Sequence, residues 1–287
     1  MNQRTVRSRA AAHTGSLTAL PETAMPEGPS IVILREQAAG FAGRTIRAAS
    51  GNSKAVDFDT LAGRPITALR SWGKHFLIQL PETALRIHLM MFGSYRINER
   101  KETSPRLSLG FDDGEELNFY ACSVKQIDPD LDAQYDWSGD VMSDRWDPKR
   151  ALAKLRAAPD MLACDALLDQ AIFAGVGNII KNEVLFRIHL HPLARIGDLP
   201  AAKLRQLVEQ ARVYSFDFLK WKKAYELKQH WLAHTRQVCP RCHIPFHRAH
   251  LGKTHRRSFF CNQCQQQYVT PARSGSTRQS QRTQPWS

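Results

Sequence analysis

Two Cys-x-x-Cys pairs near the carboxyl end constrain the fold more than any other feature of the sequence. They join Cys239 with Cys242 and Cys261 with Cys264, and eighteen residues separate the pairs. Four thiolates in two such turns form a closed tetrahedral zinc site. The residues between the pairs include few large apolar side chains, so the metal has to supply the folding energy. We therefore expect residues 236–269 to be a zinc finger with one structural zinc bound by these four cysteines.

The rest of the cysteine usage favours metal over disulfides. Cys122 and Cys164 stand alone, and no apolar secretory segment opens the chain. In a reducing compartment, paired cysteines indicate a metal site, with a redox pair as the alternative. No apolar run approaches the ~20 residues of a membrane helix. We expect a cytoplasmic protein that does not enter a membrane, associated with the DNA of a bacterial nucleoid.

The charge balance favours a polyanionic partner. Lys and Arg number 40 against 27 Asp and Glu, a net charge of +13. Each phosphate that such a surface neutralises releases counterions. Lys253, His255, Arg256 and Arg257 gather in the loop of the expected hairpin, where they can reach phosphates. The alternatives are a merely soluble basic protein and a solvated run of charges.

Hydrophobic periodicity divides the chain into a β-rich and a helical part, an α+β fold. In 25–128 we expect a β-sandwich preceded by a helix over 30–41, because short alternating runs follow one another between turns. After a linker over 129–147, residues 148–235 have helical spacing. The ends, 1–24 and 270–287, have compositions typical of disorder. The expected strands are Arg64–Leu69, His75–Leu80, Leu85–Met91, Ser94–Ile97, Leu107–Phe111 and Glu116–Tyr120, and the expected helices are 148–157, 161–173, 178–188 and 198–222.

A glycine turn interrupts the helical part at Gly175-Val176-Gly177-Asn178. Two glycines permit positive φ angles and a close approach of the backbone. Asn178 stands where a helix N-cap is expected, so the next helix would present free N–H groups to a phosphate. The alternative is an ordinary connection between two helices.

Four motifs resemble the formamidopyrimidine-DNA glycosylase and endonuclease VIII family, in the family's order. The first is Met25-Pro26-Glu27-Gly28-Pro29, and the second is Ser71-Trp72-Gly73-Lys74-His75. The third is the helix–two-turn–helix motif, which consists of Leu-Leu-Asp-Gln at 167–170, the glycine turn, and Glu-Val-Leu-Phe-Arg at 183–187. The fourth is the four-cysteine hairpin. Together they cover residues 25–268.

The resemblance implies a DNA glycosylase with AP lyase activity (β,δ-elimination) that removes oxidised bases in base excision repair. Its partner would be double-stranded DNA with a damaged base or an abasic site, and we expect a monomer. Pro26, freed by removal of Met25, would be the nucleophile. Glu27 would be the general acid/base, and Lys74 would hold a phosphate or assist proton transfer.

The resemblance also implies DNA contacts outside the catalytic residues. Asn178 and Arg256 match residues that grip phosphates. Met90, Met91 and Phe92 lie in a segment that would fill the hole left by an everted nucleotide, since apolar wedges can replace a lost stack. Burial of these three in the core of a strand is the alternative.

Three departures from the family pattern bear on function. Residues 120–125 stand where the formamidopyrimidine branch has an Asp-Pro-Arg-Arg-Phe-Gly loop, which favours the endonuclease VIII branch and oxidised pyrimidines. A lysine before the Leu-Leu-Asp-Gln motif is replaced near Cys164 and Asp165, which would weaken phosphate binding. A second acid near the amino terminus is replaced by Ser30, which could alter the protonation network around Pro26.

Residues 1–24 decide whether the lyase chemistry is available. If translation starts at Met1, the nitrogen of Pro26 is a tertiary amide and cannot be a nucleophile. We expect a start at Met25, with a disordered arm or a transit peptide as the alternatives. The competing functions are a non-catalytic protein on the same scaffold that recognises damaged or bent DNA, and an RNA- or ribosome-associated protein.

Overall fold

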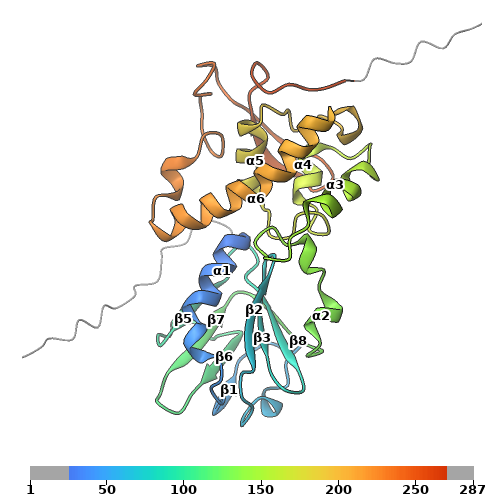
Figure 1. Cartoon of the computed structure of the whole chain (residues 1–287). Helices are drawn as coiled ribbons and strands as arrows, with labels where there is room; N and C mark the ends of the chain where they lie inside the picture. Colours follow the sequence, from blue (N-terminus) through green and yellow to red (C-terminus); the bar gives the residue numbers. More distant parts are fainter. Residues whose placement is uncertain (1–25, 270–287) are drawn as a thin grey trace, which may run out of the picture.

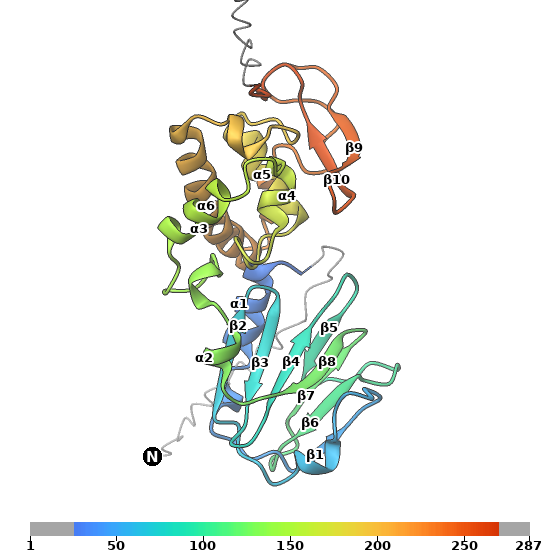
Figure 2. The same cartoon turned by 90° about the vertical axis from the view of Figure 1, so that its right-hand side faces the viewer.

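The computed structural model describes residues 26–269. The expected ends, 1–24 and 270–287, lie outside the described residues. A β-sandwich forms one half of the molecule, and a helical half with a small β-hairpin forms the other (Figures 1 and 2). No helix in the described part of the chain is long and apolar enough to cross a membrane.

Two four-stranded antiparallel sheets form the sandwich. The strand order is β1-β6-β7-β5 in one sheet and β2-β3-β4-β8 in the other. Apolar side chains from both inner faces, such as Phe76 and Phe119, form its core. The strands are β1 Ala48–Ser50, β2 Ala68–Trp72, β3 His75–Gln79, β4 Ala84–His88, β5 Ser94–Ile97, β6 Leu107–Gly110, β7 Glu116–Tyr120 and β8 Ser123–Ile127.

The sandwich was expected, but several strand boundaries were wrong. Strand β2 begins at Ala68, not Arg64, because residues 64–66 make irregular contacts with 43–46. Strand β4 ends at His88, so the expected run to Met91 is a loop. Short β1 and β8 were not expected. Only two residues connect β7 to β8 as the chain crosses between sheets, and Ala121 has a φ of 50° there.

Helix α1, Gly28–Gln37, lies at the seam between the two halves (Figures 1 and 2). It begins earlier than the expected residue 30 because Pro29 occupies its first turn, where a missing N–H costs nothing. Ile31 and Leu34 are buried in the sandwich core, and a short 3-10 turn at Ala39–Phe41 follows. The helix packs against both the sandwich and α6, so its start lies where the halves meet.

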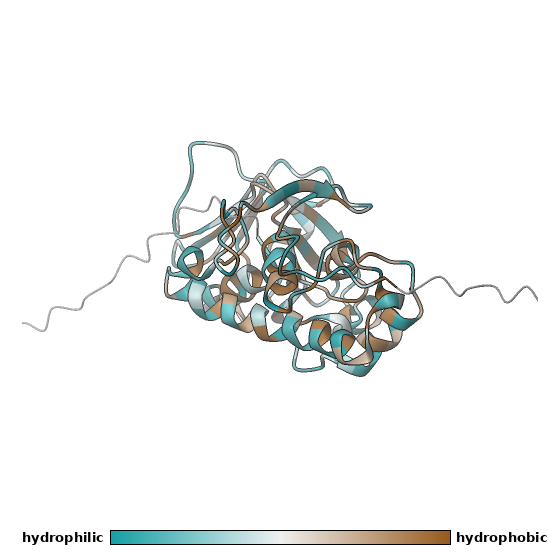
Figure 3. Cartoon of the chain, turned by 90° about the horizontal axis from the view of Figure 1, so that it is seen from above, coloured by the Kyte–Doolittle hydropathy of each residue, from teal (hydrophilic) through white to brown (hydrophobic). Residues whose placement is uncertain are grey.

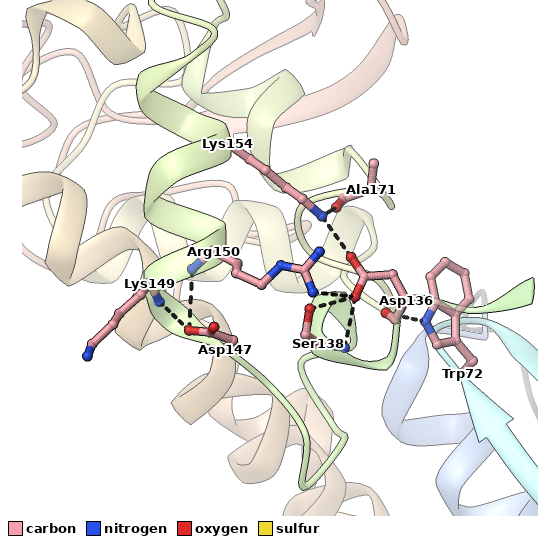
Figure 4. Close-up of polar contacts among 8 residues, drawn as sticks. All are labelled: Trp72, Asp136, Ser138, Asp147, Lys149, Arg150, Lys154 and Ala171. Atoms are coloured by element: carbon pink, nitrogen blue, oxygen red, sulfur yellow. Dashed lines mark hydrogen bonds and ion pairs between the residues drawn. The ribbon is translucent and has the colours of Figure 1, made fainter. Parts of the chain in front are cut away.

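The segment over 129–147 is packed and not an irregular linker. It contains α2, Leu131–Gln134, and a 3-10 turn at Trp137–Gly139. Tyr135 and Trp137 are buried beside Leu77 of β3. Figure 4 shows Asp136 between the two halves: its carbonyl accepts a hydrogen bond from Trp72 Nε1, and its carboxylate contacts Lys154. The segment therefore ties the end of β2 to the helical half.

Four further helices form the other half: α3 Pro148–Arg156, α4 Ala163–Leu168, α5 Asn178–Arg187 and α6 Ala201–Lys223. Asp147 caps α3 through bonds from the N–H groups of Lys149 and Arg150 (Figure 4). Helix α4 is shorter than the expected 161–173. Seen from above, hydrophilic and hydrophobic residues alternate along the long helix α6 (Figure 3), because it buries one face, whereas α5 is buried almost all round. In α6 that face includes Leu204, Leu207 and Phe218.

The carboxyl-terminal hairpin consists of β9, His247–Leu251, and β10, Arg256–Phe260. Two buried carboxylates of the helical half anchor it and the chain leading to it. Glu183 accepts hydrogen bonds from the N–H groups of 232–234, and Asp165 accepts from the N–H of Lys253. A Cβ on Gly252 would lie 2.2 Å from Asp165 Oδ1, so the tip requires glycine. The hairpin is thus held against α4 and α5.

Candidate active site and DNA-binding groove

Three glycines bring three distant segments into contact at the seam. The N–H of Gly28 donates to the carbonyl of Gly175 at 2.8 Å. A Cβ on Gly28 would lie 2.9 Å from Gly175 Cα, and one on Gly73 would lie 3.0 Å from Gly175 N. Gly175 itself has a φ of 98°, which side chains rarely adopt. Glu27 precedes Gly28, Lys74 follows Gly73, and α5 begins shortly after Gly175. The contact of the glycines therefore makes these three parts of the chain neighbours.

The carboxylate of Glu27 lies at the amino terminus of α5. It accepts hydrogen bonds from the N–H groups of Gly177 (3.1 Å), Ile179 (2.7 Å) and Ile180 (3.2 Å). Glu27 is 1% exposed, and this burial raises its pKa above the ordinary 4.5, although Lys74 and the three N–H groups oppose the rise. A buried carboxyl with a raised pKa can hold a proton and release it to a reacting oxygen.

Contrary to expectation, the N–H groups of Gly177, Ile179 and Ile180 at the start of α5 are not available to a phosphate, because Glu27 binds them. The N-cap is Gly177, and Asn178 is the first helical residue, not the cap. Asn178 is buried, and its Oδ1 has no hydrogen-bond partner among the described residues. Its side chain lines the groove described below, so the residue can contact a ligand there through its side-chain amide.

Lys74 occupies the tight turn between β2 and β3. The sequence did not indicate the residue that fixes this turn: Asp140 accepts a hydrogen bond from the N–H of Gly73 at 3.1 Å and another from Met142. Burial raises the pKa of Asp140 to about 6. Burial also lowers the pKa of Lys74, opposed by the charge of Glu27 and reinforced by Arg256. The amine of Lys74 and the carboxyl of Glu27, both with a shifted pKa, thus interact close to Pro26. Pro26 itself is buried.

An open groove lies between the loop after β4 and the carboxyl-terminal hairpin. Arg256 begins β10 at its wall and interacts electrostatically with Lys74. His234 also faces it, and burial lowers the pKa of this imidazole to about 4. The groove is lined by Met91, Asn178, His234, Thr235, His250, His255, Arg256, Arg257 and Phe259. Its cationic and amide side chains suit a phosphate-bearing ligand.

Met90, Met91 and Phe92 do not belong to the strand core. They lie in the loop between β4 and β5 and are 52%, 49% and 83% exposed. Met90 has a φ of 55°, and the N–H of Gly93 donates to the carbonyl of Leu89, which closes the loop. An apolar loop tip of this kind beside a basic groove suits insertion into a stack of bases.

The four cysteines meet as a metal site requires. Their Sγ atoms all lie within 4.8 Å of one another, and those of Cys239 and Cys264 are 3.8 Å apart. A tetrahedron with zinc–sulfur bonds of 2.3 Å has edges of about 3.8 Å. The donor set therefore fits a closed four-thiolate metal centre, with Phe186 and Phe246 packed around it.

Two of the departures from the family pattern have a structural counterpart. Ser30, which stands where the pattern has an acid, accepts a hydrogen bond from the buried Nζ of Lys222 in α6 at 2.8 Å. Cys164 and Asp165 interact electrostatically with Lys181 of α5. Neither lysine was singled out from the sequence. For Lys181, the sequence offered one indication: it follows Ile179 and Ile180 in an apolar helix.

Comparison with known proteins identifies the fold and the family. The model of the formamidopyrimidine-DNA glycosylase N-terminal domain matches residues 25–122, and that of the H2TH domain of the same glycosylases matches 140–214. Endonuclease 8 2 of Mycobacterium bovis is 31% identical over 207 residues, which are 66% of this chain and 77% of that protein. The chain belongs to the formamidopyrimidine-DNA glycosylase and endonuclease VIII family. The sequence motifs had predicted this.

A longer protein and two solved structures are also similar to this chain. Endonuclease 8-like 3 of Mus musculus is 30% identical over 214 residues, but this chain, matched over 71% of its own length, spans only 35% of the mouse protein. The crystal structure of a viral DNA glycosylase has a TM-score of 0.75 at 21% identity, covering 84% of this chain and all of that one. The Lactococcus lactis formamidopyrimidine DNA glycosylase bound to DNA with an AP site has a TM-score of 0.74, 21% identity and coverage of 84% and 99%. These structures share the fold.

Proposed function

We propose that the protein is a bifunctional DNA glycosylase and AP lyase that excises oxidised bases, with pyrimidines preferred. The observation that carries the proposal is the buried carboxyl of Glu27, held by three N–H groups of α5 and adjacent to Pro26 and Lys74. An acid, an amine and a cationic groove in one place are the groups that opening a deoxyribose and gripping its phosphates require.

The reaction begins with the nitrogen of Pro26 as the terminal amine of the chain. Its lone pair attacks C1′ of the damaged nucleotide, and the bond from C1′ to the base breaks with its electron pair leaving on the base. Glu27 donates a proton to the ring oxygen as the C1′–O4′ bond opens to an iminium. The Glu27 carboxylate, having given up its proton, takes the C2′ proton, and the electrons of that C–H bond shift through the iminium as the C3′–O bond breaks and the 3′ phosphate leaves with its electron pair. Loss of the C4′ proton then expels the 5′ phosphate in the same way, and addition of water to the remaining imine releases the sugar fragment and restores the Pro26 amine.

The remaining site residues bind the DNA. Lys74 and Arg256, whose charges interact, suit the phosphates that flank the lesion, and Asn178 offers an unpaired amide oxygen and its NH₂ group in the same groove. Met90, Met91 and Phe92 fill the space that the everted nucleotide leaves. The four cysteines would bind zinc, and the bound metal would hold the hairpin and thereby Arg256.

The preference for pyrimidines rests on the short β7–β8 connection. With two residues between these strands, the sandwich has no loop there to contact the base opposite the lesion. The duplex with a damaged base or an abasic site is the partner, bound by one copy of the chain.

Borohydride trapping tests the proposal on two forms of the protein. A chain that begins at Pro26, made by removal of Met25, should trap covalently on thymine-glycol and abasic duplexes. The full 287-residue chain, whose Pro26 nitrogen is an amide, should bind the same DNA but not trap through Pro26. No adduct with the Pro26 form would contradict the enzyme and favour a non-catalytic DNA-binding protein. A Pro26→Gly variant in the same frame, which keeps a terminal amine but loses the secondary one, should trap more slowly.

A further inference from the structure

Lys181 is a charged group that is fully buried near the groove. It lies on α5 one turn after Asn178 and is 0% exposed. Its Nζ donates to Ser258 Oγ at 2.8 Å and to the carbonyl of Arg257 at 3.2 Å. Burying an ammonium is costly unless it is paired and hydrogen-bonded. The amine meets this condition through two acceptors at the beginning of strand β10, and so ties that strand to α5.

The charged and titratable groups around Lys181 come from four segments of the chain. Cys164 and Asp165 face it from α4, Arg256 from β10, Glu27 from the segment before α1 and His234 from the chain before the hairpin. Three of these groups lie in the candidate site, Arg256 and His234 in the groove and Glu27 at the start of α5. Burial lowers the pKa of Lys181 to about 8, and the charge of Arg256 contributes to the lowering.

We propose that Lys181 is a positioning residue for DNA binding: it clamps Arg257 and Ser258 so that the neighbouring Arg256 faces a DNA phosphate, and its charge adds to the potential of that site. The inference rests on the proposed function. It assigns to a buried residue, which no DNA reaches directly, part of the affinity that would otherwise be credited to Arg256 alone.

The hydrogen bonds set the geometry of this coupling. Arg256, Arg257 and Ser258 are consecutive in β10, and Ser258 and Phe259 are buried against α5. Asn182, the next residue of α5, accepts a bond from the N–H of Phe259 at 3.2 Å. Without the ammonium, Asn182 alone would hold β10 against α5. The backbone at Arg256 would then be less firmly fixed, and so would the direction of its side chain.

Equilibrium binding of the full chain to a duplex with a tetrahydrofuran abasic-site analogue tests the inference. Lys181→Met removes the ammonium and keeps the volume. It should weaken binding about tenfold, because hydrogen bonds to charged groups contribute this much. Lys181→Arg should restore most of the affinity. The control is Lys203→Met: Lys203 also donates to a backbone carbonyl, that of Ile188, but at the opposite end of α5, so binding should change less than about twofold.

The pH profile separates positioning from simple structural support. Between pH 7.5 and 9.5 the wild-type ammonium loses its proton, so affinity should fall more steeply than in Lys181→Arg, whose guanidinium stays charged. The other titrating groups, Lys74 among them, are the same in both proteins and cancel in the comparison.

The outcomes are distinguishable from failure of the proposed function. If the wild type does not bind the duplex, the DNA-binding function itself is wrong. If it binds and Lys181→Met binds equally well, only the inference is overturned. If Lys181→Met does not fold, as judged by zinc content, then Ser258→Ala and Lys181→Arg decide. Ser258→Ala should weaken binding about threefold through loss of one hydrogen bond, and unchanged binding together with an unchanged pH profile in Lys181→Arg would overturn the inference.

Discussion

The carboxylate of Glu27 accepts a 2.7 Å hydrogen bond from the backbone N–H of Ile179, 152 residues further along the chain. A helix amino terminus offers N–H donors to an acidic group, and here that group belongs to the protein itself. The bond joins the first residues of the sandwich half to the first turn of α5. The acid of the proposed reaction therefore keeps its place only while the two halves stay docked.

Gly177→Ala should disable the site without unfolding the protein. A Cβ at this position would lie 2.4 Å from Glu27 Cδ, and the φ of −123° is open to alanine, so the effect is purely steric. We expect a loss of stability of about 1–3 kcal/mol from overpacking. Base excision should fall on the order of 100-fold, as when a general acid is misplaced. Excision rates and thermal unfolding measure the two effects.

Gly40→Ala is the matched control for this substitution. No heavy atom lies within 4 Å of its added Cβ, and no positive φ constrains it. Its excision rate should equal that of the wild type. An active Gly177→Ala enzyme would show that Glu27 can work from another position.

Asp140→Asn should change the pH dependence of stability. Folding raises the pKa of Asp140 from 3.8 to about 6 by burial, so the folded state favours the protonated acid. That stabilisation is fully present below pH 3.8 and is lost as the pH rises through about 6. The variant cannot lose it, so its free energy of unfolding relative to the wild type should rise by up to about 3 kcal/mol between pH 4 and pH 7. Denaturant titrations at both pH values measure this difference, and a difference independent of pH would contradict the assignment.

The sequence predicted the parts of the site that sit in local motifs. The turn at Gly73 and Lys74, the glycines before α5 and the cysteine pairs each have a spacing with a physical cause, and the structure brings them together. It could not predict which acid would fix the Lys74 turn. Asp140 lies in an acidic segment that has no periodicity, and its burial is decided by tertiary packing alone.

The same limit explains the error at α5. The Gly177-Asn178 sequence at a helix start predicts an exposed anion site, because no nearby residue in the sequence is a partner for the N–H groups. The partner is Glu27, and only the three-glycine junction places it there. Lys181 escaped notice for a related reason: its acceptors belong to the hairpin, 76 and 77 residues away.

Loss of one cysteine ligand should abolish metal binding by the hairpin. Cys261→Ser breaks the four-thiolate set, so we expect much less than one equivalent of zinc by metal analysis. Affinity for abasic duplex should fall about 10- to 100-fold, because β10 then no longer presents Arg256. Cys122→Ala is the control, since that thiol is buried in the sandwich core and distant from the metal site. It should retain a full equivalent of zinc, and a Cys261→Ser protein with full zinc content would refute the four-cysteine centre.

Phe92→Ala should affect DNA binding and leave stability unchanged. Phe92 is 83% exposed at the tip of the β4–β5 loop, so its truncation leaves no cavity, and the free energy of unfolding should change by less than about 0.5 kcal/mol. If the ring fills the space of an everted nucleotide, its removal should weaken binding to a duplex with a central lesion by about 1–3 kcal/mol, the energy of stacking on one base. Binding to undamaged duplex should change far less, because no gap has to be filled there. Val213→Ala, an exposed apolar truncation on α6, should alter neither affinity. Equal weakening of both duplexes by Phe92→Ala would instead assign the ring a general contact with DNA.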